Sequence, residues 1–156
     1  MRDNYLKELQ KEGIVVIENF FTKKKCDRII KQIEDFSYKE KIINQRDEGL
    51  GGDLRIFGFE KFSSDASDFS SNDFLKTIVS KYSNSNLKSE STLAGKVIFE
   101  DNKETNSGGD WHRDGDVKQL KAMLYLSDVN NQNGPFCFIK GSKEFDFERR
   151  NKEYPF

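Results

Sequence analysis

The chain is 156 residues long, which suits a single domain over residues 1–156. Its 26 basic and 27 acidic side chains leave a net charge of −1, so charge gives no argument for binding to nucleic acid or to an anionic membrane surface. Apolar residues make up only 35% of the sequence, but they include 14 phenylalanines, and we therefore expect an aromatic-rich core.

The two cysteines, Cys26 and Cys137, lie far apart in the sequence and form no CxxC pattern, so no disulfide framework is expected. Cys137 is flanked by two phenylalanines and is interpreted as a buried core residue. The polar N-terminus lacks the apolar stretch of a signal peptide, and no apolar run approaches the roughly 20 residues of a membrane span. These features predict a soluble protein of the cytoplasm.

The first part of the chain is predicted to contain two helices around one strand. Residues 2–12 have amphipathic spacing, and Gly13 is a natural helix end. The β-branched run at residues 14–20 predicts a buried strand. Thr22 is a suitable N-cap for a second helix of about 14 residues with one apolar stripe. That stripe consists of Cys26, Ile29, Ile30, Ile33 and Phe36.

The middle of the chain alternates between polar stretches and short apolar elements. Residues 37–53 and 63–73 are rich in polar residues, and both are expected to be connectors. Residues 54–62 are strand-like, and Asn72 or Asp73 could cap the helix that follows. That helix would carry Phe74, Leu75, Ile78, Val79 and Tyr82.

The second half is predicted to form strands. Residues 91–100 and 118–129 both alternate in polarity, and Asn133-Gly134 is a strong hairpin signal before a returning strand at residues 135–140. One face of the first segment carries Leu93, Val97 and Phe99. In the second, Leu120, Ala122, Leu124 and Leu126 share one face, and Lys121, Met123 and Tyr125 share the other. Helices followed by strands predict an α+β protein, mostly antiparallel β.

The stretch GGDWHRDGD, residues 108–116, contains the only histidine and the only tryptophan of the chain. In an extended backbone, residues two apart project to one face, so His112 and Asp114 could reach the same metal ion. Two histidines and one carboxylate form the iron site of non-haem Fe(II) oxygenases. A three-residue pattern is a weak signal and also fits a histidine in a polar turn. Its position beside Trp111, between a Gly-rich loop and a strand, favours a metal half-site.

Three blocks of the sequence, in the right order, resemble the phytanoyl-CoA dioxygenase family. The block LQKEGIVVIENFFTKKKCDRIIKQIEDF resembles the helix–strand–helix opening of that family. GGDWHRDGD is similar to its His-x-Asp iron motif, and KAMLYLSDVNNQNGPFCFIKGSKE resembles its next hairpin, with Asn-Gly at the turn.

This resemblance implies a double-stranded β-helix, a cupin-like jelly roll, preceded by helices. It implies an Fe(II)- and 2-oxoglutarate-dependent dioxygenase that uses O2 to hydroxylate a small organic substrate. His112 and Asp114 would bind the iron. Lys121, Met123 and Tyr125 would line the cosubstrate pocket, where Lys121 or Tyr125 could meet a 2-oxoglutarate carboxylate. That face could equally be a solvent-exposed sheet surface. Apart from the resemblance, the position and glycine content of residues 44–53 and 101–110 suggest the hypothesis that they shape the substrate entrance.

The sequence departs from the family pattern at the second histidine, because His112 is the only one. The arginine that follows that histidine in the family has no assigned counterpart. Three explanations stand side by side. The chain is the N-terminal part of a longer enzyme, with its jelly roll incomplete at the C-terminus. It is a catalytically inactive jelly-roll binding module. Or a carboxylate such as Glu144 or Asp146 replaces the distal ligand.

Other site chemistries find less support in the sequence. A zinc site of paired Cys and His residues is excluded by their number and spacing. Asp114 and Asp116 could bind Ca2+ or Mg2+ in a binding module, but the spacing of a calcium loop is missing.

Overall fold

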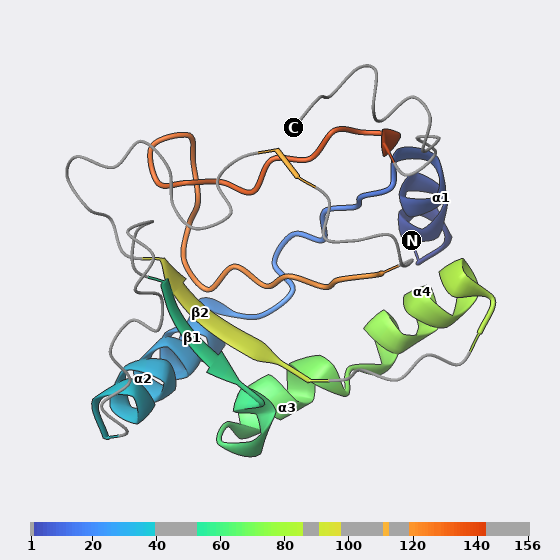
Figure 1. Ribbon diagram of the computed structural model, residues 1–156. Coiled ribbons are helices and arrows are strands. Elements are labelled where there is room, and N and C mark those ends of the chain that lie inside the picture. Colours follow the sequence, from blue (N-terminus) through green and yellow to red (C-terminus); the bar gives the residue numbers. More distant parts are fainter. Residues whose placement is uncertain (1, 40–52, 86–90, 98–110, 113–118, 143–156) are drawn as a thin grey trace. The chain divides into compact units, whose positions relative to one another are not determined.

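The computed structural model describes residues 2–39, 53–85, 91–97, 111–112 and 119–142. These residues gather into two compact units, one drawn from residues 1–20, 73–87 and 127–156, the other from residues 21–72 and 88–126. The elements are α1 (Arg2–Glu12), α2 (Lys23–Lys39), β1 (Asp53–Phe57), the 3-10 turn η1 (Phe59–Lys61), α3 (Ser64–Ser70), α4 (Asp73–Ser83) and β2 (Leu93–Val97) (Figure 1).

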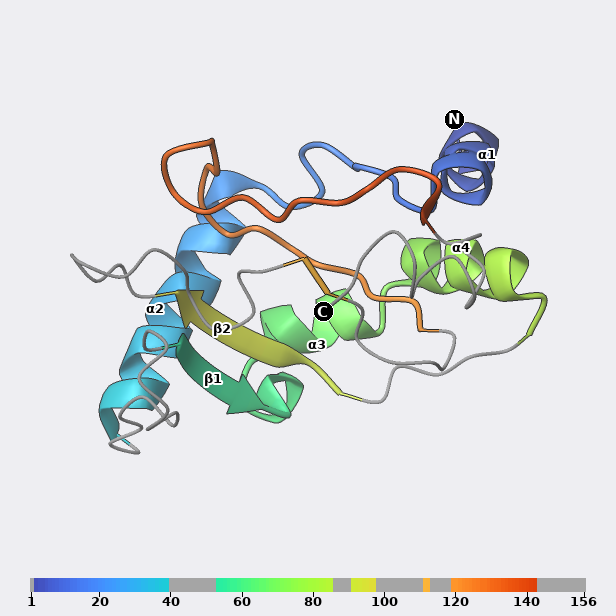
Figure 2. The same cartoon turned by 45° about the horizontal axis from the view of Figure 1, so that its top comes forward.

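The unit of residues 21–72 and 88–126 is built on one apolar layer. Strands β1 and β2 pair antiparallel, and α2 and α3 cover one face of this two-stranded sheet (Figures 1 and 2). Phe59, which directly follows the turn after β1, is only 1% exposed. The buried residues of the layer are Ile29, Ile33, Leu54, Ile56, Phe59, Ala66 and Ala94.

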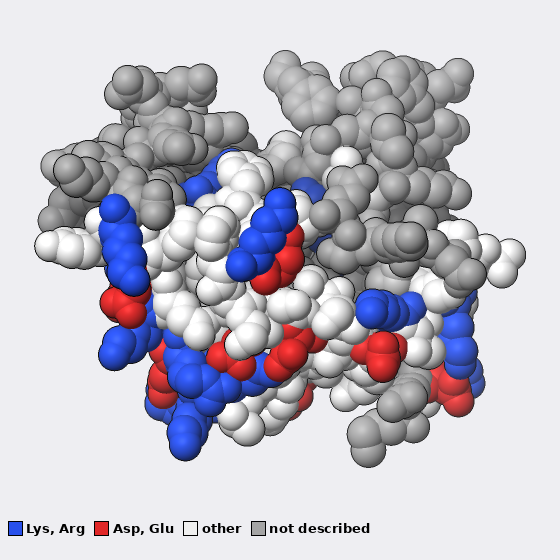
Figure 3. Space-filling model, turned by 90° about the horizontal axis from the view of Figure 1, so that it is seen from below, with Lys and Arg blue, Asp and Glu red and all other residues white. Residues whose placement is uncertain are grey.

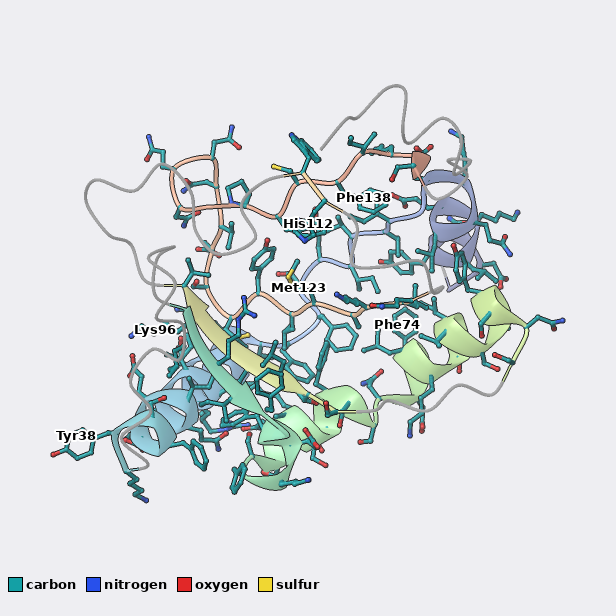
Figure 4. All side chains as sticks on the ribbon, viewed as in Figure 1. Tyr38, Phe74, Lys96, His112, Met123 and Phe138 are labelled. Carbon is teal, nitrogen blue, oxygen red and sulfur yellow. The ribbon has the colours of Figure 1, made fainter. Side chains whose placement is uncertain are left out.

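Helix α2 begins where the sequence predicted. The backbone N–H of Lys25 donates to the side-chain oxygen of Thr22 at 3.3 Å, so Thr22 caps the helix. The predicted stripe is confirmed, because Cys26, Ile29 and Ile33 are buried. Lys96 of β2, labelled in Figure 4, also reaches α2, with its Nζ 3.5 Å from a carboxylate oxygen of Glu34.

The β1–β2 sheet has one buried and one exposed face. Ile56 pairs opposite Ala94, and both lie on the buried face. The alternation predicted for residues 91–100 is found only in part: among residues 91–97 only Ala94 is buried, and Leu93 and Val97 lie on the exposed face, with 49% and 62% of their surface accessible. Register decides this, because a side chain's face follows from the residue it pairs with. Phe99 lies outside the described residues.

The turn after β1 fixes the start of β2. Gly58 has a φ of 70°, in the left-handed region that glycine adopts without strain, so the strand-like run 54–62 ends as a strand at Phe57. The N–H of Thr92 donates to the Glu60 carboxylate at 2.8 Å, and the N–H of Phe59 donates to the Thr92 carbonyl at 3.1 Å. The bond from Thr92 lowers the pKa of Glu60.

The predicted connector at residues 63–73 is wrong, because it contains helix α3. Ser63 is the N-cap, and its hydroxyl oxygen accepts the N–H of Ala66 at 3.1 Å. The same hydroxyl donates to Gln32 of α2 at 2.5 Å. A run of serine and aspartate that favours turns in isolation becomes helical here because its cap is satisfied and Ala66 packs into the core.

Asp65 of α3 is a buried carboxylate with two cationic partners on α2. Arg28 donates to its two oxygens at 3.0 and 2.8 Å, and the Nζ of Lys25 lies 3.7 Å away. Lys25 also contacts Asp68 at 2.8 Å. The hydrogen bonds from Arg28 outweigh burial and lower the pKa of the Asp65 carboxyl. On the described part of the face in Figure 3, basic and acidic side chains are interleaved rather than separated by sign.

The unit of residues 1–20, 73–87 and 127–156 joins the two other helices. Helices α1 and α4 are confirmed, and Tyr5 and Phe74 meet edge to face with ring centroids 6.0 Å apart. Gly13 ends α1 with a φ of 80°, and its N–H donates to the Leu9 carbonyl at 3.0 Å. The N–H of Gly141 donates to the Glu12 carbonyl at 2.7 Å.

The predicted strand at residues 14–20 is wrong. The described structure contains no strand there, Val16 is 69% exposed, and Asn19 has a φ of 53°. A β-branched run favours an extended backbone, but it forms a strand only where another strand pairs with it. None of the described segments does so.

The predicted hairpin is present as a turn but not as paired strands. The N–H of Asn133 donates to the Asn130 carbonyl at 3.1 Å, and Gly134 has a φ of 73°. Residues 119–142 contain no strand. Most of the first predicted arm, residues 119–126, belongs to one unit, and the second arm, residues 135–140, belongs to the other. The described chain is thus a mixed structure of helices and one small antiparallel sheet, with helices predominating over the expected β-structure. The jelly roll and the single domain stay predictions.

We expect Ser63→Ala to lower the free energy of unfolding by about 1–2 kcal/mol, because it removes the cap of α3 and the hydrogen bond to the partly buried side chain of Gln32. Urea unfolding followed by circular dichroism measures the change. Ser64→Ala, at the exposed first position of the helix, is the matched control and should change stability by less than about 0.5 kcal/mol. Equal effects of the two substitutions would contradict the capping role.

Asp65→Asn should lower the free energy of unfolding by about 1–3 kcal/mol at neutral pH, where the wild-type carboxylate is charged and bound to Arg28. The folded-state pKa of Asp65 is lowered, so this stabilisation is present above the unfolded pKa of about 3.9 and is lost as the pH falls through the folded value. Unfolding curves at several pH values should converge for wild type and variant in acid. Asp68→Asn, which removes an exposed ion pair, is the control and should lower the free energy of unfolding by less than about 1 kcal/mol.

Candidate iron and cosubstrate site

His112 is described, and it follows Trp111 on a short non-helical stretch (Figure 4). Both side chains are exposed, Trp111 to 63%. Asp114 lies outside the described residues, as do most of residues 44–53 and all of residues 101–110, which were expected to shape the entrance. An exposed imidazole is accessible to a metal ion or a substrate.

The described residues do not by themselves assemble a complete metal site. Within them, no three histidine, cysteine, aspartate or glutamate side chains lie close enough together to hold an ion. Glu144 and Asp146, considered as replacement ligands, also lie outside the described part of the chain. His112 therefore fits an iron site only as one donor among others, and the half-site of His112 and Asp114 stays a prediction.

The predicted cosubstrate residues lie on an extended stretch that packs on the core of its unit. Leu124 and Leu126 are partly buried and contact the apolar layer. Lys121, Met123 and Tyr125 alternate with them and are exposed, Met123 to 57% and Tyr125 to 47%. The predicted two-residue period is confirmed at these positions, although Ala122 is exposed and no strand forms.

This alternation has a simple physical cause. Leucine side chains gain from leaving water, and an extended backbone then turns every intervening residue to the opposite side. Lys121, Met123 and Tyr125 therefore share one accessible face. That face suits a ligand with a carboxylate, since it combines an ammonium group with a phenol.

Cys137 is not the buried core residue that the sequence predicted. It is exposed, while Cys26 is the buried one, and both are free thiols. The thiol of Cys137 lies 3.7 Å from the carbonyl oxygen of Pro135. Flanking phenylalanines did not bury it, because Phe136 is itself 59% exposed.

The charged cluster around Asp65 is the group of titratable side chains that sequence reasoning missed. Its signal is faint: Lys25 and Arg28 are one helical turn apart on α2, and Asp65 and Asp68 are one turn apart on α3. Only the packing of α2 against α3 brings the two basic residues next to the two acidic ones. The resulting ion pairs link the two helices and have a structural role. Two surface hollows, one along α4 and one beside Phe36 and Phe62, are lined by none of the predicted site residues.

Among the described helices, none is both long enough and apolar enough to cross a membrane.

We expect Leu124→Ala to lower the free energy of unfolding by about 1–2 kcal/mol, less than for a fully buried leucine, because this side chain is partly buried against the core. Met123→Ala, at the neighbouring exposed position, is the matched control and should change it by less than about 0.5 kcal/mol. Thermal or urea unfolding measures both. The reverse order would show that the segment presents its other face.

The sequence matches the model of a known protein family. The sequence model of the phytanoyl-CoA dioxygenase family matches residues 9–156, a span that includes His112, Asp114 and the Lys121–Tyr125 stretch. No curated protein and no solved structure gives a significant match. Because the match covers nearly the entire sequence, the chain belongs to the phytanoyl-CoA dioxygenase family.

Proposed function

We propose that this protein is an Fe(II)- and 2-oxoglutarate-dependent dioxygenase that hydroxylates a small organic substrate with O2. The observation that carries the proposal is the family match over residues 9–156, which spans the His-x-Asp motif. The fold proposed with it is the family's cupin-like jelly roll in a single domain. A cytoplasmic location is proposed from the cysteine usage alone.

His112 and Asp114 are proposed as two of the iron ligands. The exposure of His112 supports this role, since a ligand imidazole must be accessible to the ion and to the molecules that bind beside it. When bound, iron together with 2-oxoglutarate and O2 supplies the oxidising chemistry. The 156 residues contain one histidine, so two iron ligands are proposed and the third is left unassigned.

Lys121, Met123 and Tyr125 are proposed to bind 2-oxoglutarate. The Lys121 ammonium and the Tyr125 hydroxyl are donors that match a carboxylate. Met123 lies between them and offers an apolar, adaptable surface for the aliphatic part of the cosubstrate. The packing of Leu124 and Leu126 on the core supports the role, because it fixes which face the three residues present.

The alternative function is a catalytically inactive binding module of the same family. The observation that favours it is the single histidine, because two protein ligands hold Fe(II) more weakly than three. Both functions use the same accessible face. They differ in whether iron and 2-oxoglutarate bind together.

The test is anaerobic titration of the protein with Fe(II) and 2-oxoglutarate. An active site should give a visible charge-transfer band, and His112→Ala or Asp114→Asn should weaken iron binding by at least roughly tenfold, since even an outer-shell partner of a metal commonly costs that much. Asp73→Asn, which alters a fully exposed carboxylate on α4, is the matched control and should leave the band unchanged.

The outcomes separate the two functions. A band that depends on His112, followed by succinate formation on admission of O2, supports the dioxygenase. No band, with iron affinity unchanged in His112→Ala, contradicts it and leaves the inactive module.

A further inference from the structure

In the loop of residues 128–134, both the oxygen and the nitrogen of the Asn133 side-chain amide form hydrogen bonds to the backbone. The Oδ1 of Asn133 accepts the N–H of Asn130 at 2.6 Å, and its Nδ2 donates to the carbonyl of Asp128 at 2.9 Å. Both partners precede Asn133 in the chain. The carboxamide is therefore held toward the N-terminal side of the loop. The Asn130 side chain supports the same turn by accepting the N–H of Gln132 at 2.8 Å.

The residue on the other side of Asn133 is Gly134. It has a φ of 73° and open space where a side chain would lie. The Asn-Gly pair occurs once in the sequence. A glycine nitrogen is the least hindered backbone nucleophile toward a preceding carboxamide, since the residue that carries it has no Cβ. Asn133 is also exposed, so water has access to the site.

We propose that Asn133 is a deamidation site and that the folded loop restrains the reaction. The backbone nitrogen of Gly134 would bond to Cγ of Asn133, the Cγ–Nδ2 bond would break, and the displaced amide hydrogen would leave with Nδ2 as ammonia. Water would then open the five-membered imide, leaving aspartate or isoaspartate at position 133. Water is the only co-reactant, and no electrons are transferred.

The restraint follows from the hydrogen bonds. Cγ cannot approach the Gly134 nitrogen while Oδ1 and Nδ2 are held by Asn130 and Asp128. Breaking one or two neutral hydrogen bonds before reaction slows the native protein roughly 5- to 30-fold relative to the unfolded chain. Once formed, the product carboxylate cannot donate to the Asp128 carbonyl, so the reaction also removes one of the bonds that close the loop.

The experiment compares the full chain in native buffer and in urea at mildly alkaline pH. Trypsin releases residues 122–140, and mass spectrometry follows conversion of Asn133 in that peptide over time. We expect conversion in urea and conversion roughly 5- to 30-fold slower in the native protein. Asn131 is an internal control in the same peptide. It should remain unmodified in both conditions, because Gln132 rather than glycine follows it.

Two variants test the cause. Asn130→Ala removes the acceptor for Gln132 and loosens the turn, so the native rate should rise toward the urea rate while the urea rate stays unchanged. Asn133→Gln should abolish conversion at this position. Equal native and urea rates in the wild type, an Asn130→Ala native rate equal to that of wild type, or no conversion in urea would each overturn the proposal.

Discussion

One apolar layer, in which Ile29 and Ile33 of α2 meet Leu54 and Ile56 of β1, holds the unit that contains His112 together. Burial of aliphatic and aromatic surface is the dominant favourable term in folding, and here it is concentrated in a single layer. The layer also orients the candidate cosubstrate segment, because Leu124 and Leu126 pack against it. The accessible face of Lys121, Met123 and Tyr125 is thus a consequence of core packing.

Polar contacts fix how the helices of that layer meet. Asp65 is 7% exposed, and such a carboxylate is tolerated only because Arg28 binds both of its oxygens. Ser63 serves both helices, since it caps α3 and donates to Gln32 of α2. These contacts specify the packing of the unit, and the proposed chemistry does not use them.

The proposed iron chemistry is constrained by the number of histidines in the sequence, which is one. The motif around His112 and the family match both point to an iron oxygenase, yet the chain holds one imidazole in total. The number of protein donors decides whether Fe(II) is retained while 2-oxoglutarate and O2 occupy the open positions. In the proposal, the number of protein donors distinguishes the dioxygenase from the inactive binding module.

The sequence by itself determined the elements whose signals are local. The apolar stripe of α2, its Thr22 cap, the Gly13 end of α1 and the turn at Asn133-Gly134 depend on residues within a few positions, and each was predicted. The His-x-Asp motif and the family were also visible in the sequence, because both depend on residue order. The alternation of Lys121, Met123 and Tyr125 with the leucines was also predicted, because a two-residue period of apolar and polar residues is visible in the sequence.

Only the tertiary structure decided the features that need a distant partner. The run 14–20 found no described strand to pair with, and register placed Leu93 and Val97 on the exposed face of the sheet. Helix α3 forms from a turn-like sequence because Ser63 hydrogen-bonds to Gln32 and Ala66 packs into the core. Cys137 remained exposed between two phenylalanines. In each case, burial and pairing depend on what packs against the residue, and the neighbouring sequence does not contain that information.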